Sequence, residues 1–205
     1  MEPLRGFGNK YVARVSCPAR EKMQMSLAGN TRKFSVTSAR VSNSRLYPGG
    51  LVSSLVTSAE TQDHFSLFEA RMQPGSEPPL HLHEERDVVF YVLEGEMDVY
   101  CGTQVRAART GDAVFLPRLL PHTYKVQSPA VRFLALMAPA KKIEGYFEGL
   151  SQPVSNMDLP TGATVSPPPD IASVLTLAAE HGVKFLTPNE TANDECPGPR
   201  RREGE

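Results

Sequence analysis

Short apolar runs, each of strand length, follow one another through the middle of the chain. Proline, glycine or polar residues separate them at intervals of roughly ten residues, a spacing typical of β-sandwiches and barrels. Turn signals such as Glu94-Gly95 and Cys101-Gly102 fall between the runs. The pattern predicts eight antiparallel strands, at residues 51–57, 64–72, 88–93, 97–101, 104–108, 113–117, 122–126 and 131–137. We therefore expect a small β-barrel.

The composition agrees with this architecture and argues against several others. The 205 residues include 18 Pro and 15 Gly, too many chain breakers for a bundle of long helices. The 22 Lys and Arg nearly balance the 23 Asp and Glu, so no overall charge marks a nucleic-acid or membrane binder. Cys17, Cys101 and Cys196 are scattered, which indicates neither a disulfide framework nor a cysteine-based zinc site.

No apolar run is long enough to span a membrane, and the first 20 residues lack the apolar stretch of a signal peptide. We therefore expect a cytoplasmic protein that binds neither nucleic acid nor a membrane. Asp170 and Gly182 are the expected caps of a helix between them. Four segments are expected: an N-terminal arm or peripheral strands at 1–44, the barrel at 45–137, a C-terminal helical extension at 138–187, and a flexible tail at 188–205.

His81-Leu82-His83 is the most informative local feature of the sequence. Residues i and i+2 of a strand share one face, where two imidazoles can reach a single metal ion. The pair follows the bend signalled by Pro78-Pro79. An isolated pair of this kind also occurs on solvated strand edges, so its meaning depends on the surrounding sequence.

Two blocks, GSEPPLHLHEERDVVFYVLEG at residues 75–95 and GDAVFLPRLLPH at residues 111–122, resemble the paired motifs of the cupin superfamily. Leu119 and Val126 replace a glycine and an asparagine of the second motif. Over about residues 45–187 the chain is similar to single-domain cupins described as quercetin 2,3-dioxygenase-like. The matching motif positions are Gly75, His81, His83 and Gly95 in the first block, and Gly111, Pro117 and His122 in the second.

This resemblance implies an all-β cupin barrel, which is a double-stranded β-helix or jelly roll, with an N-terminal arm and C-terminal helices packed outside. It also implies a metal site made of His81, His83 and His122. The family's metal-binding glutamate falls on Val88, which cannot coordinate a metal. Three neutral imidazoles leave a divalent ion its full charge and open positions. Fe(II) is the expected metal, with Zn, Ni, Mn and Co as alternatives.

Asp87 lies next to the vacated position, and a one-residue slip of the strand would turn its side chain inward. This makes Asp87 a candidate catalytic residue. The favoured alternative is that the charged run 84–87 forms a solvated turn, because four consecutive charged residues are costly to bury.

Strand alternation predicts the pocket lining. Counting from Val88 points Phe90 and Val92 into the barrel, and counting from His122 adds Tyr124. Tyr124 is a second candidate catalytic residue, because its hydroxyl needs a partner. Arg71 shares a strand face with Glu69, so it either contributes a polar group to the pocket or belongs to an exposed pair. Such an apolar and aromatic lining suits a flat hydrophobic ligand.

Three functions remain open at this point. The first is a dioxygenase with a three-histidine metal site that acts on a small phenolic, polyketide or diketone-like substrate, since some iron-dependent cupins have this ligand set. The second is a non-oxidative cyclase, isomerase or decarboxylase, which is favoured by the missing carboxylate. The third is a noncatalytic ligand-binding cupin. For each of them we expect a small-molecule ligand and a homodimer.

Overall fold

The structure is a computed structural model that describes residues 33–160 and 170–186. The strands and helices described below lie within the unit Phe34–Glu205. The expected tail and most of the expected N-terminal arm lie outside the described residues.

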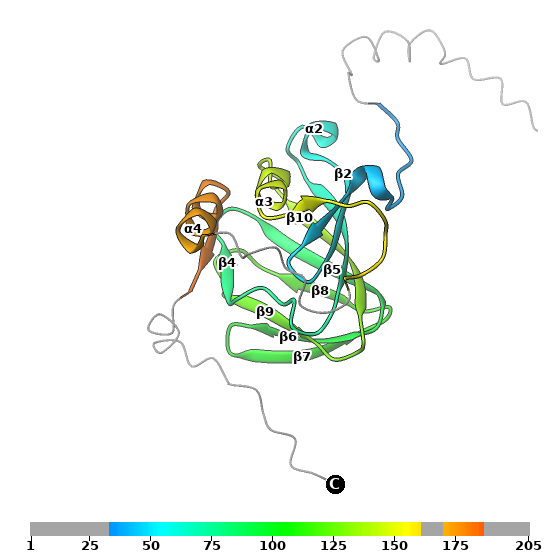
Figure 1. The fold of residues 1–205 in the computed structure, drawn as a ribbon. Coiled ribbons are helices and arrows are strands. Elements are labelled where there is room, and N and C mark those ends of the chain that lie inside the picture. The colour runs from blue at the N-terminus through cyan, green and yellow to red at the C-terminus, as the bar shows by residue number, and fades with distance from the viewer. Residues whose placement is uncertain (1–32, 161–169, 187–205) are drawn as a thin grey trace, which may run out of the picture. The chain divides into compact units, whose positions relative to one another are not determined.

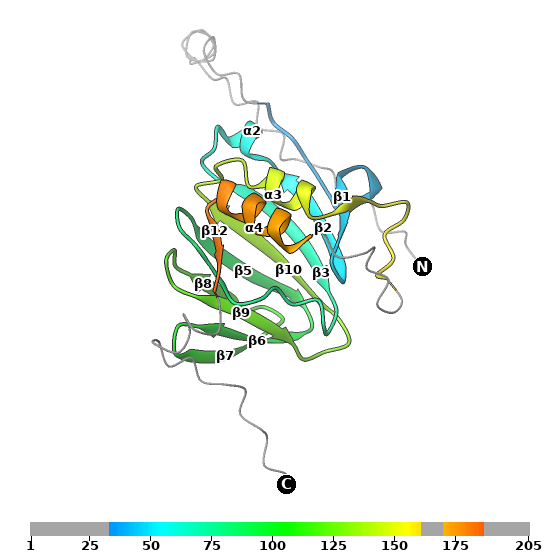
Figure 2. The ribbon, with the colours of Figure 1, turned by 60° about the vertical axis from the view of Figure 1, so that its left-hand side comes forward.

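Two antiparallel sheets form the jelly roll (Figure 1, Figure 2). The strand order is β11-β1-β2-β3-β10-β5-β8 in the larger sheet and β12-β4-β9-β6-β7 in the smaller one. The strands of the described residues are β1 (Ser44–Tyr47), β2 (Gly50–Val56), β3 (Ser66–Met72), β4 (His81–His83), β5 (Asp87–Glu94), β6 (Glu96–Cys101), β7 (Gln104–Arg109), β8 (Ala113–Leu116), β9 (His122–Val126), β10 (Val131–Ala138), β11 (Gln152–Pro153) and β12 (Val183–Phe185).

All eight strands predicted from the sequence are present, as β2, β3 and β5 to β10. The predicted all-β cupin fold is thereby confirmed. Alternation explains the prediction: along β3 and β10, every second side chain is buried between the sheets. Phe68, Met97 and Phe133 are among the core residues supplied in this way. The strands outside these eight, β1, β4, β11 and β12, span only two to four residues, too few to show a period.

Short helices accompany the sheets: a 3-10 turn (Val41–Asn43), α2 (Ser58–Thr61), α3 (Glu144–Gly149) and α4 (Ile171–Glu180). The predicted N-cap of α4 is confirmed, since the Asp170 carboxylate accepts a hydrogen bond from the Ser173 amide at 3.1 Å, whereas the C-cap is His181 rather than Gly182. Gly182, just beyond the helix, has a φ of 63°. Figure 2 shows α3 and α4 side by side at one end of the barrel. No described helix has the length and apolar character needed to cross a membrane.

The segment expected to be a helical extension also supplies a strand to the barrel. β12 pairs with β4, the strand that carries His81 and His83. Backbone hydrogen bonds extend this pairing on both sides, from Glu84 N to Gly182 O at 2.9 Å and from Leu186 N to Leu80 O at 3.0 Å. The histidine-bearing strand is therefore held between β9 and β12 rather than left at the edge of its sheet.

The expectation that residues 84–87 form a solvated turn is wrong for Arg86. Its side chain is 1% exposed, and its Nη2 donates a hydrogen bond to the His181 carbonyl at 2.7 Å. The last carbonyls of a helix lack intrahelical donors, and His181 is the C-cap of α4. Arg86 is buried because it satisfies this helix end.

Candidate metal centre

The three motif histidines come from two neighbouring strands. His81 and His83 lie on the same face of β4, because one residue separates them. His122 begins β9 and is the direct cross-strand partner of His81. Directly opposite residues on antiparallel strands have Cβ atoms about 4.5–5.5 Å apart. Strand pairing alone therefore brings the three imidazoles together.

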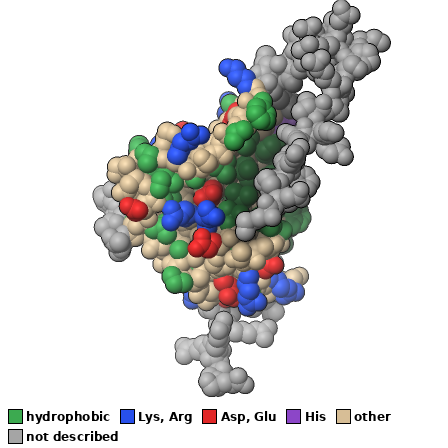
Figure 3. All heavy atoms as spheres, turned by 90° about the vertical axis from the view of Figure 1, so that its right-hand side faces the viewer, with side chains coloured by type: hydrophobic (Ala, Val, Ile, Leu, Met, Phe, Trp, Pro, Cys, Tyr) green, Lys and Arg blue, Asp and Glu red, His purple; other side chains and the backbone are tan. Residues whose placement is uncertain are grey.

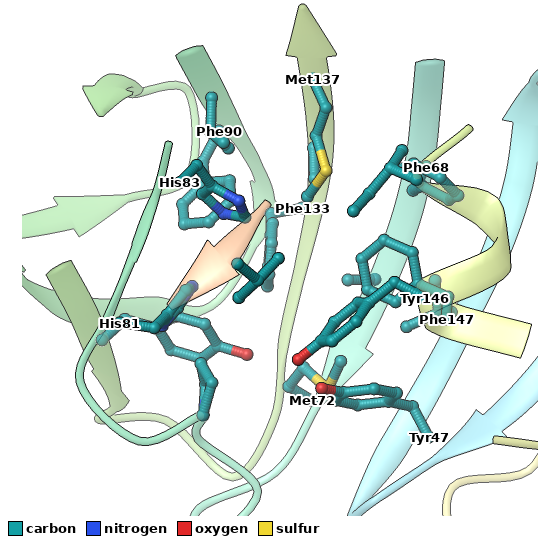
Figure 4. A pocket seen from close by; sticks show the side chains of 18 of the residues that line it. Tyr47, Phe68, Met72, His81, His83, Phe90, Phe133, Met137, Tyr146 and Phe147 are labelled. Atoms are coloured by element: carbon teal, nitrogen blue, oxygen red, sulfur yellow. The ribbon is translucent and has the colours of Figure 1, made fainter. Parts of the chain in front are cut away.

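The imidazoles form a compact cluster. Ring centroids are 4.6 Å apart for His81 and His122, 5.2 Å for His81 and His83, and 5.3 Å for His83 and His122. One potential ligand atom from each ring lies within 4.8 Å of the others. His83 and His122 are buried, and His81 is partly buried. Figure 4 shows His81 and His83 on one side of the pocket.

Backbone carbonyls orient two of the rings. The Nδ1 of His81 lies 2.9 Å from the Pro79 oxygen, and the Nδ1 of His122 lies 2.9 Å from the Leu120 oxygen. A carbonyl can only accept, so each Nδ1 carries the proton and each Nε2 keeps its lone pair. Such carbonyl partners are typical of metal-binding histidines.

The third ring has an unsatisfied nitrogen. Nδ1 of His83 is buried and has no hydrogen-bond partner among the described residues. A buried polar atom without a partner is costly. Coordination of a metal ion would remove that cost if this nitrogen carried the lone pair.

The environment keeps the cluster neutral. Desolvation, reinforced by the neighbouring His122, lowers the pKa of His81 to about 3. Desolvation and the proximity of His81, His122 and Arg86 lower the pKa of His83 to about 2. Burial also lowers the pKa of His122, against the opposing effect of its hydrogen bond to Leu120. A divalent metal requires neutral imidazoles, so the donor set fits such an ion.

Among the described residues that line the cavity, no carboxylate takes the place of the missing family glutamate. Val88 is 1% exposed and lines the cavity beside the histidines. The alternative in which a slipped strand turns Asp87 inward is wrong, since β5 pairs continuously with β10 from Asp87 to Val92. The Asp87 side chain points away from the cavity and forms an ion pair with Arg118 at 2.8 Å. Hydrogen bonds from Arg118 lower the Asp87 pKa to about 2.

The histidines open onto a cavity of about 80 Å³ between the two sheets. Val88, Phe90 and Tyr124 line it, as the strand alternation predicts, whereas Val92 is buried in the core beyond it. Arg71 does not line the cavity, so its assignment to the pocket is wrong. It alternates outward on β3, and its Nη1 donates to the Met157 carbonyl at 2.8 Å.

Several lining residues were not foreseen. Tyr47 comes from the short strand β1, and Tyr146 from α3. Alternation along β10 could have identified Phe133, Ala135 and Met137, because the strand prediction already covered these residues. The described residues that line the cavity are Tyr47, Val52, Phe68, Ala70, Met72, Pro78, His81, His83, Val88, Phe90, His122, Tyr124, Phe133, Ala135, Met137, Ile143, Tyr146, Phe147 and Val183.

The cavity wall is uncharged: none of its described residues is Lys, Arg, Asp or Glu. A groove of about 420 Å³ lies next to the cavity, lined by Leu150, Phe185 and side chains of α4. Tyr47 and Pro78 line both spaces. Figure 3 shows hydrophobic side chains lining a hollow on one face of the molecule. Because the inner cavity is smaller than a typical ligand pocket of about 300–1,000 Å³, it suits a small ligand or one end of a larger one.

Leu119, which replaces a motif glycine, has the backbone conformation that a glycine would favour. Its φ is 65°, in the left-handed region, and its side chain is 63% exposed. Its amide donates to the His83 carbonyl at 2.8 Å. The loop before His122 therefore contacts the first motif directly and keeps this geometry without the glycine. The motif glycines Gly75, Gly95 and Gly111 also have positive φ values, of 89°, 86° and 95°.

Comparison with known proteins agrees with this fold. Residues 68–137, which include all three histidines, match the family model described as the cupin domain. This stretch of the chain is therefore a cupin domain. An uncharacterized protein of Aquifex aeolicus is 34% identical over 65 residues, which are 32% of this chain and 53% of that protein. The match thus spans about half the length of this relative.

Solved structures with a similar arrangement include KdgF from Halomonas sp., which is 22% identical, with 45% of this chain and 80% of that chain covered and a TM-score of 0.41. A predicted oxalate decarboxylase from Thermotoga maritima is 19% identical, with 50% and 98% covered and a TM-score of 0.45. A double-stranded β-helix protein from Klebsiella pneumoniae is 18% identical, with 55% and 88% covered and a TM-score of 0.41.

The substitution Val88→Glu is expected to tighten metal binding, because it places a carboxylate on the cavity wall beside three imidazoles. Loss of an outer partner of a metal ligand costs about 10- to 100-fold in affinity, so a new direct ligand should gain at least about tenfold. Calorimetric titration of the metal-free protein with Zn(II) measures the change in affinity. Val92→Glu is the matched control, since Val92 is equally buried on the same strand but does not line the cavity. Equal affinities in both variants and the parent would contradict the placement of Val88.

Proposed function

We propose that this cupin is a metal-dependent dioxygenase that acts on a small apolar or aromatic substrate, such as a phenol or a diketone. The observation that carries the proposal is a neutral cluster of three histidines in the wall of an uncharged, largely aromatic cavity. An all-nitrogen ligand set suits Fe(II), and three protein ligands leave coordination positions open.

His81, His83 and His122 would hold the metal. When bound there, Fe(II) supplies redox chemistry with dioxygen and polarises a substrate oxygen. The described cavity wall has no carboxylate to act as a general base, so the substrate must ionise easily. A phenol or an enolisable ketone meets this requirement, whereas an aliphatic alcohol does not.

The aromatic side chains hold the substrate body and exclude water. The rings of Phe90 and Phe133 are 4.7 Å apart, and both pack against Tyr124, at 6.1 Å and 5.7 Å. The two pairs with Tyr124 are edge-to-face and the third is tilted, and such contacts fix the orientations of the rings. The Tyr124 hydroxyl is the polar group of this cluster, and burial raises its pKa, so that it stays protonated and donates a hydrogen bond.

A non-oxidative isomerase, cyclase or decarboxylase is the second candidate. The combination of a protonated Tyr124 and a wall without carboxylates favours it, because a buried phenol can return a proton to a carbanion. The metal site is the same in both proposals, and the two differ in whether dioxygen is consumed.

Oxygen dependence separates the two candidates. We expect the Fe(II)-loaded full-length protein, given a panel of phenols and 1,3-diketones, to consume dioxygen in step with substrate. Products formed under ¹⁸O₂ should carry both labelled atoms by mass spectrometry. Under strict anaerobiosis the same mixture should show no turnover. Undiminished anaerobic conversion to a product of unchanged oxidation level would replace the dioxygenase by the non-oxidative enzyme.

A further inference from the structure

Three tyrosine side chains border the cavity that the histidines open onto. Tyr47, Tyr124 and Tyr146 come from β1, β9 and α3, three elements that are distant in sequence. Tyr124 and Tyr146 are 7% and 6% exposed. In an otherwise apolar wall, these hydroxyls and the imidazoles are the polar side-chain groups of the described residues.

Two of the hydroxyls interact with each other. Figure 4 shows Tyr47 and Tyr146 with their oxygens close together, across the pocket from His81 and His83. A side-chain hydrogen bond joins the pair. A phenol that accepts a hydrogen bond keeps its own O–H for another partner, so the pair uses one of its two donors and leaves the other.

Tyr124 carries the third hydroxyl, which has no hydrogen-bond partner among the described residues. Its ring is fixed between Phe90 and Phe133, and it lines the cavity. A tyrosine hydroxyl is protonated at neutral pH, so each of the three phenols can donate a hydrogen bond. Two O–H donors, one from the pair and one from Tyr124, are therefore left for a ligand.

We propose that Tyr47, Tyr124 and Tyr146 form a phenol subsite that binds a second oxygen of the substrate, across the cavity from the histidines. This inference rests on the proposed function and narrows its substrate class. The substrate then has two oxygens on a small apolar body: one that ionises and faces the histidines, and one that accepts hydrogen bonds from the phenols. An uncharged wall lacks the cations that would pair with a phosphate, so phosphorylated substrates do not fit.

The ring fixation makes these tyrosines specificity-determining rather than general packing residues. Phe147 contacts Tyr47 at 5.8 Å and Tyr146 at 5.6 Å between ring centroids, so replacement of either tyrosine by Phe keeps the aromatic cluster. Only a hydroxyl is lost. An unpaired buried donor penalises a ligand that lacks the acceptor, and sites of this kind discriminate strongly between such analogues.

Two probes of nearly the same shape test the subsite: 4-hydroxybenzaldehyde, which carries the second acceptor oxygen, and 4-methylphenol, which lacks it. Their dissociation constants are measured by calorimetry with the Zn(II)-loaded and the metal-free full-length protein. The unmodified chain should prefer the aldehyde. The preference is the dissociation constant of 4-methylphenol divided by that of 4-hydroxybenzaldehyde. In Tyr124→Phe and in Tyr146→Phe this ratio should fall by about three- to tenfold, which corresponds to the loss of one neutral hydrogen bond. The unequal acidity of the probes cancels, because the ratio is compared between variants.

Tyr91→Phe is the matched control, since Tyr91 is 45% exposed on β5 and does not line the cavity; its ratio should equal that of the unmodified chain. An unchanged ratio in the cavity variants of both metal-loaded and metal-free protein would overturn the phenol subsite. If the protein does not bind Zn(II) but the ratio still depends on the tyrosines, the metal-dependent function is overturned and the subsite is supported. Loss of metal binding is therefore distinguished from loss of the subsite.

Discussion

Replacement of His122 by alanine is expected to abolish stoichiometric metal binding while the barrel stays folded. The substitution removes one of three ligands and leaves a pair on β4 with no cross-strand partner. The loss of an outer partner of a ligand already costs about 10- to 100-fold, so removal of a ligand itself should cost more than about 100-fold. Metal content of the purified protein by mass spectrometry, together with Fe(II) and Zn(II) titrations, measures the effect.

His64→Ala is the control for that experiment. His64 is exposed and lies just before β3, outside the cluster, so its loss should leave the metal content unchanged. Circular dichroism of both variants checks the fold. Full metal occupancy in His122→Ala with a native spectrum would show that the three histidines are not the ligands.

The metal-free protein is expected to lose stability in mild acid, starting near neutral pH. Unfolded histidines bind a proton with a pKa of about 6.5, whereas burial holds folded His81 at about 3 and His83 at about 2. Between these limits the unfolded chain binds more protons than the folded one, so stability falls as the pH decreases from about 6.5 towards 3. Each such histidine contributes a slope of up to about 1.4 kcal/mol per pH unit.

Urea unfolding in the presence of a chelator, at pH 7.5, 6.0 and 4.5, tests this dependence. We expect the free energy of unfolding at pH 4.5 to be at least about 2 kcal/mol lower than at pH 7.5. A variant with His81 and His83 both replaced by glutamine should show a much flatter dependence above pH 4.5. A parent protein as stable at pH 4.5 as at pH 7.5 would contradict the buried, neutral state of the cluster.

The sequence was informative wherever one side of an element is buried and the other is not. Alternation located eight strands, and the His81-Leu82-His83 pattern with its second motif led to a cluster that the structure brings together. Alternation along β3 also indicates which way the Arg71 side chain points. Phe68, Ala70 and Met72 are the apolar, inward positions of β3, so Arg71 between them must point outward.

The features of the fold and the site that were not predicted depend on contacts between segments that are distant in sequence. Tyr47 and Tyr146 are adjacent only because β1 and α3 meet at the same cavity, and nothing local to either residue indicates this. Arg86 is buried because the end of α4, some 95 positions later, needs a donor. Charge patterns predict solvation from neighbours in sequence, and tertiary packing overrides such predictions when a specific partner is available.

The pairing of β12 with β4 has a consequence for the order in which the site can form. Val183 lies opposite His83, about 100 residues further along the chain. A nascent chain in which both motifs have left the ribosome, but residues 183–185 have not, holds β4 from one side only, through the single pairing of His81 with His122. Contacts so far apart in sequence form late in folding. The arrangement of the three histidines is therefore complete only after residues 183–185 have paired with β4.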